Sequence, residues 1–107
     1  MIKVSVLYPN KPGAQFDTSY YLAKHMPMVA SKLGAAVKAT SVDQGMAGPA
    51  PGSPPAFVMM AHFTFESTST FQAAFGPHAA EIMGDIQNYT SIEPIIQISE
   101  VMEALAG

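Results

Sequence analysis

Hydrophobic and polar residues alternate along several segments of the chain, and this period of two is the pattern of β-strands. Residues 56–66 show it most strongly, because every second side chain from Phe57 to Phe65 is apolar while His62 lies on the other face. Residues 2–8 alternate in the same way, and residues 92–102 form a third alternating segment. Residues 36–45 are less apolar, so we expect a strand at the edge of the sheet there.

Two further segments repeat their apolar residues at helical spacing. Asp17 is suited to cap the first helix, whose apolar positions continue to Leu33 and stop before Gly34. Pro27 lies inside this segment and cannot donate a backbone hydrogen bond to the preceding turn. We therefore expect the helix to kink or restart near His25.

Glycine and proline interrupt the chain at two more places. The second helical segment follows the hydroxyl residues 67–70 and is broken at Gly76 and Pro77, where we expect a kink or restart. Residues 45–55 contain so much glycine and proline that no regular element is expected there. This loop is open to two interpretations, a plain connection between strands or a flap over a pocket.

The resulting order βαββαβ predicts an α+β fold of the ferredoxin-like type, a four-stranded antiparallel sheet with both helices on one face. One domain over residues 1–107 is expected for a chain of this length. The other face of the sheet would then need a cover. The less apolar side chains would lie there, namely Ser5, Leu7, Met60, His62, Gln97 and Ser99. A second copy packing its sheet on this face would close a barrel with a ligand pocket inside, so we expect a homodimer.

Composition narrows the possible partners. Hydrophobic residues make up 49% of the chain and charged ones only 12%, which also favours an apolar surface buried against a second copy. A net charge of −3 argues against nucleic acid as a partner. Cysteine is absent and the apolar runs are too short to cross a bilayer, so we expect a cytoplasmic protein with no membrane contact.

The candidate chemistry centres on Tyr21 and His25. Their spacing of four places a phenol and an imidazole on the same helix face, where they could act together on a ligand. His25 could be a general acid or base at a pocket, or it could only bond the carbonyl that the proline break leaves free. Tyr21 would orient a ligand as a hydrogen-bond donor, or serve only as core packing.

Other residues are expected to contact a ligand rather than to carry chemistry, namely Tyr20, Met60, His62 and Gln97. The three histidines His25, His62 and His78 have no local metal-ligand spacing, and no phosphate loop or nucleophile motif is present, so no metal and no cofactor are expected. Metal ligation by these three histidines, if the fold brings them together, is the weaker alternative. The acidic residues form no carboxylate pair and are assigned to solvent or to helix caps.

The chain resembles the EthD family, named for a protein of ethyl tert-butyl ether degradation. The resemblance is carried by Phe16-Asp17-x-x-Tyr20-Tyr21-x-x-x-His25-x-Pro27, by residues 81–90 and by residues 92–101. It implies the dimeric α+β barrel superfamily, which includes cofactor-free monooxygenases, isomerases and cyclases. Tyr20, Tyr21 and His25 match its signature, whereas Gln87 stands where relatives often have proline.

Two functions from different classes follow from these expectations. The first is a cofactor-independent enzyme, a monooxygenase, isomerase or cyclase of a degradation pathway, acting on a small hydrophobic oxygenated molecule. The second is a non-catalytic binding or accessory protein of an oxidative degradation system that uses the same cavity. A cavity filled by side chains, with a purely structural dimer, is the third alternative.

Overall fold

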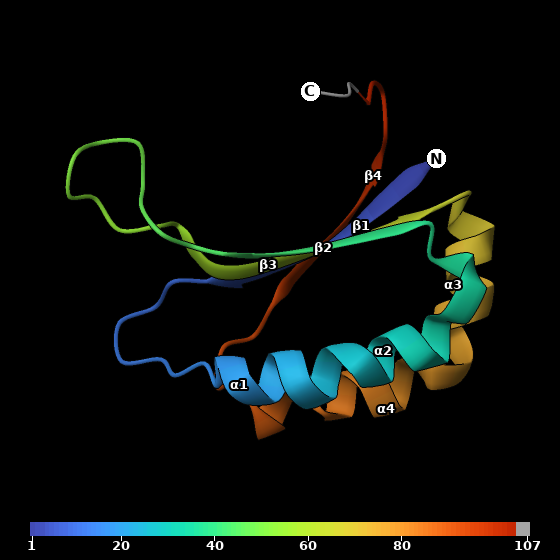
Figure 1. The fold of residues 1–107 in the computed structure, drawn as a ribbon, viewed down its shortest axis with the longest axis horizontal. Helices are drawn as coiled ribbons and strands as arrows, with labels where there is room; N and C mark the ends of the chain where they lie inside the picture. The colour runs from blue at the N-terminus through green and yellow to red at the C-terminus, as the bar shows by residue number, and fades with distance from the viewer. Residues whose placement is uncertain (105–107) are drawn as a thin grey trace.

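One four-stranded antiparallel sheet forms one layer of the molecule, and helices cover one of its faces (Figure 1). The computed structural model describes residues 1–104. The strand order is β2-β3-β1-β4. The strands are β1 (Ile2–Pro9), β2 (Ala39–Gln44), β3 (Phe57–Phe65) and β4 (Ile95–Glu100). This is the predicted ferredoxin-like arrangement, and β2 has the predicted place at an edge.

The last strand is shorter than the predicted segment 92–102. Ile92 is buried and turned out of the ladder, because its backbone N–H donates to the Thr90 hydroxyl at 3.1 Å. Pro94 then has no N–H to contribute to a ladder. The sheet pairing of β4 therefore begins only at Ile95, opposite Leu7 of β1.

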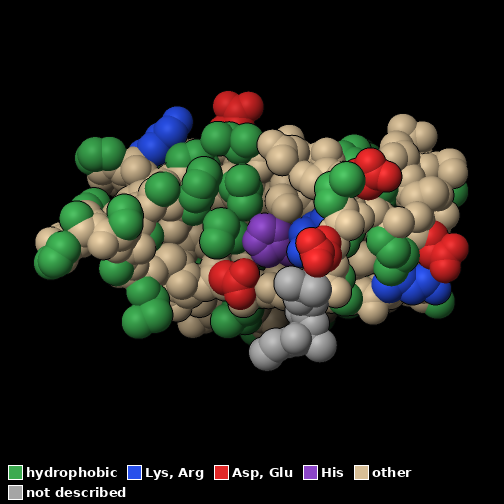
Figure 2. Space-filling model, turned by 90° about the horizontal axis from the view of Figure 1, so that it is seen from above, with side chains coloured by type: hydrophobic (Ala, Val, Ile, Leu, Met, Phe, Trp, Pro, Cys, Tyr) green, Lys and Arg blue, Asp and Glu red, His purple; other side chains and the backbone are tan. Residues whose placement is uncertain are grey.

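Strand register separates the side chains into two faces. On the helix side, one row across the sheet contains Val42, Ala61, Val6 and Ile96. On the other side, which we call the open face, one row contains Ser41, His62, Ser5 and Gln97, and the next contains Asp43, Met60, Leu7 and Ile95. Figure 2 looks onto the open face, where histidine, acidic and basic side chains lie among hydrophobic ones. The predicted division into an apolar and a mixed face is confirmed.

The first helical segment is interrupted where the sequence predicts it. It consists of α1 (Thr18–Tyr20), a π-helical turn (Tyr21–His25), α2 (Met26–Leu33) and a short 3₁₀ turn (Gly34–Ala36). Asp17 caps its start by accepting a hydrogen bond from the Tyr20 N–H at 3.0 Å. The Met26 N–H bonds the Tyr21 carbonyl, one residue further back than in an α-helix. The interruption is thus a widened turn just before Pro27.

The second helical segment is also built in pieces. It consists of α3 (Thr68–Phe75), a 3₁₀ turn (Gly76–His78), α4 (Ala79–Gly84) and a second 3₁₀ turn (Ile86–Asn88). The Ser67 hydroxyl caps α3 by accepting a hydrogen bond from the Thr70 N–H at 3.1 Å. The predicted break at Gly76 and Pro77 is present as the 3₁₀ turn.

Residues 45–55 contain no helix or strand and form a hairpin loop closed by a hydrogen bond from the Gly48 N–H to the Ser53 carbonyl. Figure 1 shows this loop projecting beyond the sheet and away from the helix layer. It therefore does not cover the space between helices and sheet. Within residues 1–104 no helix has the length and apolar character that crossing a membrane requires.

The end of α2 depends on a backbone conformation that favours glycine, since Gly34 has φ +58°. We predict that Gly34→Ala lowers the free energy of unfolding by about 1–3 kcal/mol. Gly84→Ala is the matched control, because Gly84 lies in α4 without a positive φ, is not followed by proline, and a Cβ would meet no atom within 4 Å at either glycine. The control should be neutral or slightly stabilising. Equal losses in chemical denaturation would contradict the role of the positive φ.

Candidate functional site

An apolar cavity of about 90 Å³ lies between the helices and the sheet. Its walls come from β1, β3 and β4 on one side and from both helical segments on the other. Tyr8, Tyr21 and His25 supply the polar groups of a lining that is otherwise aliphatic, aromatic or methionine. Ile96, which is 46% exposed, forms the wall at β4.

His25 is buried and is held by a carboxylate from the other helical segment. The Nδ1 atom of His25 lies 2.9 Å from Oδ2 of Asp85. Its Nε2 atom lies 3.4 Å from the Tyr89 hydroxyl, a long contact. His25 therefore bonds side chains and not the carbonyl that the proline break leaves free, so that alternative is wrong.

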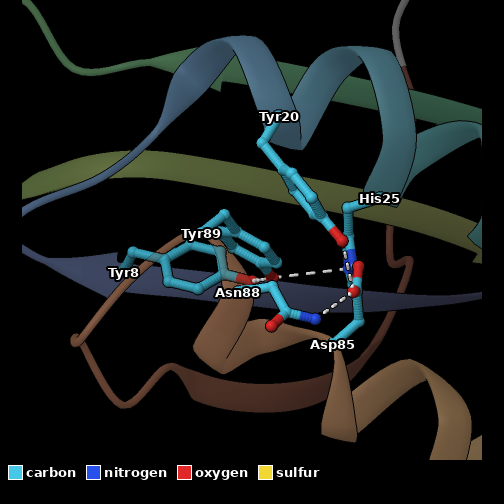
Figure 3. A network of polar contacts seen from close by, with 6 residues as sticks. All are labelled: Tyr8, Tyr20, His25, Asp85, Asn88 and Tyr89. Atoms are coloured by element: carbon cyan, nitrogen blue, oxygen red, sulfur yellow. Dashed lines mark hydrogen bonds and ion pairs between the residues drawn. The ribbon is translucent and has the colours of Figure 1, made fainter.

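Asp85 collects three side-chain hydrogen bonds at the end of α4 (Figure 3). Tyr20 donates its hydroxyl to Oδ1 at 2.7 Å, and Asn88 donates its amide to the same oxygen at 2.9 Å. Partial burial opposes ionisation of Asp85. The hydrogen bonds from Asn88, Tyr20 and His25, together with the charge that His25 can carry, outweigh it and hold the pKa of the carboxyl below its usual value. Asp85 is therefore an ionised acceptor that fixes the imidazole with a proton on Nδ1.

Two tyrosines, Tyr21 and Tyr89, pack against this imidazole, and a third, Tyr8, hydrogen-bonds to Tyr89. The Tyr21 and His25 rings stack with centroids 5.6 Å apart, and the Tyr89 ring lies 4.6 Å from His25. The Tyr89 and Tyr8 hydroxyls are 2.6 Å apart. Burial raises the pKa of all three phenols, most strongly at Tyr89, so they act as hydrogen-bonding groups and not as phenolates.

Tyr21 has a hydroxyl available for a ligand. The side chain is only 1% exposed and lines the cavity, yet no group among residues 1–104 hydrogen-bonds to its hydroxyl. No fully buried side-chain oxygen or nitrogen of residues 1–104 lacks a partner, so this hydroxyl keeps some open space beside it, where a bound oxygen atom would accept its hydrogen bond.

The structure does not bring all the predicted ligand residues into this cavity. Met60, His62 and Gln97 lie on the open face, because strand alternation directs them away from the helices. Tyr20 lies on the outer side of Asp85 and lines a surface groove with Lys24. These four residues therefore do not line the same cavity as His25. Their contact with a ligand stays a prediction.

His62 has its own polar contacts on the open face. Its Nδ1 atom is 2.7 Å from the Ser5 hydroxyl, and its Nε2 atom is 3.8 Å from an Asp43 oxygen. His78 lies on the 3₁₀ turn between α3 and α4. No group of three or more His, Asp or Glu side chains within residues 1–104 has an arrangement that could hold a metal ion.

Sequence patterns alone do not identify two residues of this site, Asp85 and Tyr8. The sequence assigns Asp85 to solvent or to a helix cap, and it gives Tyr8 no role beyond its place in the alternating segment 2–8. Both act through partners far along the chain, 60 residues away for Asp85 and 81 for Tyr8. The signal that could have found Asp85 is its place in the segment 81–90, which carries part of the family resemblance.

Comparisons with known proteins agree with this fold and with the family resemblance of residues 81–90. The family model described as the EthD domain matches residues 13–93. An EthD-like protein from Ralstonia eutropha JMP134 is 51% identical, with a TM-score of 0.92 over 98% of this chain and 95% of that chain. A comparison with curated proteins gave no significant match.

Two more distant structures are similar in fold alone. An ethyl tert-butyl ether (EthD) family protein from Bacillus halodurans C-125 has 18% identity and a TM-score of 0.65, covering 95% of this chain and 99% of that chain. The protein At3g17210 from Arabidopsis thaliana has 14% identity and a TM-score of 0.69, covering 99% and 100% respectively.

The Asp85 carboxylate predicts a pH dependence of stability. Because its pKa is lower in the folded chain, ionised Asp85 stabilises the fold above the carboxyl's usual pKa, near 4, and this contribution is lost as pH falls through the folded value. We expect Asp85→Asn to cost about 1.5–3 kcal/mol of unfolding free energy at pH 7 and progressively less below about pH 4. The exposed Glu66→Gln is the control. A difference from wild type that stays constant between pH 7 and 3 in denaturant titrations would contradict this role.

Proposed function

The chain belongs to the EthD family, and from its cavity we propose that it binds a small hydrophobic oxygenated molecule and removes a proton from it, with His25 as the base. The observation that carries the proposal is the pairing of two groups on one apolar wall. These are an imidazole held by Asp85 and the Tyr21 hydroxyl, which lacks a partner among the described residues.

The cavity restricts the ligand by size and by polarity. A volume of about 90 Å³ is smaller than the engineered cavity of about 150 Å³ that takes up benzene, so a single small ring or a short branched chain is the appropriate size. The aliphatic and aromatic walls favour an apolar body. One carbonyl or ether oxygen on that body would accept a hydrogen bond from Tyr21.

Removal of a proton from the carbon next to a carbonyl would use both the His25 imidazole and the Tyr21 hydroxyl. Asp85 holds a proton on Nδ1 of neutral His25 and stabilises the imidazolium that forms when Nε2 gains a second one. The Tyr21 hydroxyl would donate to the oxygen on which negative charge develops. This step is common to isomerisation, cyclisation and cofactor-independent oxygenation, so the geometry supports the shared step without choosing among the three.

The homodimer expected from the sequence is part of the proposal, with the open face as the contact surface. Ile95 is 52% exposed there and lies in one row with Leu7 and Met60, which are half-buried. Hydrogen bonds between Ser5 and His62 and between Gln97 and Ser99 already satisfy part of the neighbouring polar row, which lowers the cost of covering it. A cytoplasmic location and a role in a degradation pathway stay predictions.

Binding and chemistry can be tested with butanone and cyclobutanone, two ketones that are smaller than benzene. We expect both ketones to raise the melting temperature, and the protein to accelerate exchange of their α-hydrogens in D₂O, followed by proton NMR. His25→Asn keeps a donor for Asp85 but has no base, so the acceleration should fall by about 10²-fold or more. His78→Asn is the matched control and should exchange like wild type.

An undiminished rate in His25→Asn would contradict the role of His25. If both ketones stabilise the wild type and His25→Asn equally and neither protein accelerates exchange, the function is non-catalytic binding.

For the dimer, we expect Ile95→Glu to convert a protein of twice the chain mass to a monomer in light scattering after size exclusion. Leu22→Glu places the same charge at a residue that is 51% exposed on the outer side of the helices, so it is the control and should stay dimeric. A wild-type protein that elutes as a monomer at high micromolar concentration would rule the dimer out.

A further inference from the structure

A chain of hydrogen-bonding groups runs from Asp85 through His25 and Tyr89 to Tyr8 (Figure 3). Its contacts are 2.9 Å from Asp85 Oδ2 to His25 Nδ1, 3.4 Å from His25 Nε2 to the Tyr89 hydroxyl, and 2.6 Å between the Tyr89 and Tyr8 hydroxyls. Tyr8 lines the apolar cavity. The chain thus connects the carboxylate at the end of α4 with a phenol on β1 that a ligand would touch.

The Asp85 carboxylate determines which group donates and which accepts in each of these hydrogen bonds. Ionised Asp85 can only accept, so His25 donates from Nδ1 and accepts at Nε2. Tyr89 must then donate to Nε2, and Tyr8 must donate to the Tyr89 oxygen. The Tyr8 oxygen is left at the cavity end with its lone pairs free to accept a proton.

Both nitrogens of the imidazole face protein groups. Nδ1 is taken by Asp85 and Nε2 is directed at the Tyr89 hydroxyl, so a ligand in the cavity has no unobstructed nitrogen to approach. A proton that leaves the ligand for His25 therefore has a path through the two phenols. Edge-to-face packing of Tyr8 against Phe16 and of Tyr89 against Phe16 holds these phenols in place.

On the basis of the proposed function, we propose that Tyr8 is a further catalytic residue, which takes the proton from the ligand, and that Tyr89 is a positioning residue that relays it to His25. The ligand's C–H bond breaks and its electron pair stays on the ligand as an enolate. Tyr8 gains this proton and passes its own to Tyr89, which passes its own to Nε2. The step leaves both phenols neutral, the ligand with one negative charge and His25 with one positive charge.

The cycle can close through Asp85. Its side chain is 16% exposed and lines a surface groove together with Lys24, Glu81 and Asn88. The Nδ1 proton of the imidazolium can exchange with water along this side. The proton on Nε2 returns along Tyr89 and Tyr8 when the ligand is reprotonated, and this restores neutral His25 with its proton on Nδ1. Burial raises the pKa of Tyr8 and Tyr89, which favours a concerted transfer over a phenolate intermediate.

The relay is tested with cyclobutanone carrying tritium at the α-carbon, by measuring tritium release into solvent. We expect release to fall at least tenfold in Tyr8→Phe and in Tyr89→Phe, while His78→Asn keeps the wild-type rate. Each phenylalanine variant loses only one oxygen atom, and a retained rise in melting temperature with unlabelled cyclobutanone would show that its cavity is intact.

A second measurement on the wild type needs no variant. Release in mixtures of H₂O and D₂O should depend on the deuterium fraction along a curve, because several exchangeable protons move in one step. A linear dependence, or undiminished release from Tyr8→Phe, overturns the relay. If His25→Asn is inactive in that case, the proposed function stands. If His25→Asn is as active as wild type, or if the wild type releases no tritium, the proposed function fails together with the relay.

Discussion

The hydrogen bond between Asp85 and His25 is the contact on which the rest of the site depends. It joins the first helical segment to the end of the second across 60 residues of sequence. A buried imidazole with an unsatisfied nitrogen costs about 1–3 kcal/mol, and the carboxylate removes that cost while fixing which nitrogen carries the proton. The orientation of Tyr89, and through it of Tyr8, follows from this single choice of tautomer.

The local backbone explains why His25 reaches that carboxylate. Pro27 cannot bond the turn before it, and the chain responds with a π-helical turn over Tyr21–His25. The wider turn still leaves Tyr21 and His25 on one side, where their rings stack. Proline therefore acts indirectly, through the backbone that presents the imidazole to the helix–sheet layer.

Most of the fold could be predicted from the sequence, because alternation in β1 and β3 and helical spacing around Phe71 and Phe75 are local patterns. The pairing of Tyr21 with His25 is local too, and it was predicted from a spacing of four. Asp85 could not be found in this way, since nothing in its own neighbourhood distinguishes a carboxylate that meets a distant imidazole from one that meets water. Tyr8 shares its strand face with Val4 and Val6, and only the position of Tyr89 turns it from a core residue into a hydrogen-bonding one.

The position of the cavity illustrates the same limit on a larger scale. Alternation predicts that β3 has two different faces, but it does not say on which of them space is left. That space results from how Met26, Phe71, Phe75 and Met83 fill the layer under the helices, which depends on packing between distant segments. Because His62 and Met60 leave the sheet on the opposite side from Ala61, a partner subunit on the open face and a ligand beside His25 would use different side chains of the same strand. The proposed dimer contact and the proposed ligand contact would therefore be separable, and a substitution on one face of β3 need not disturb the other.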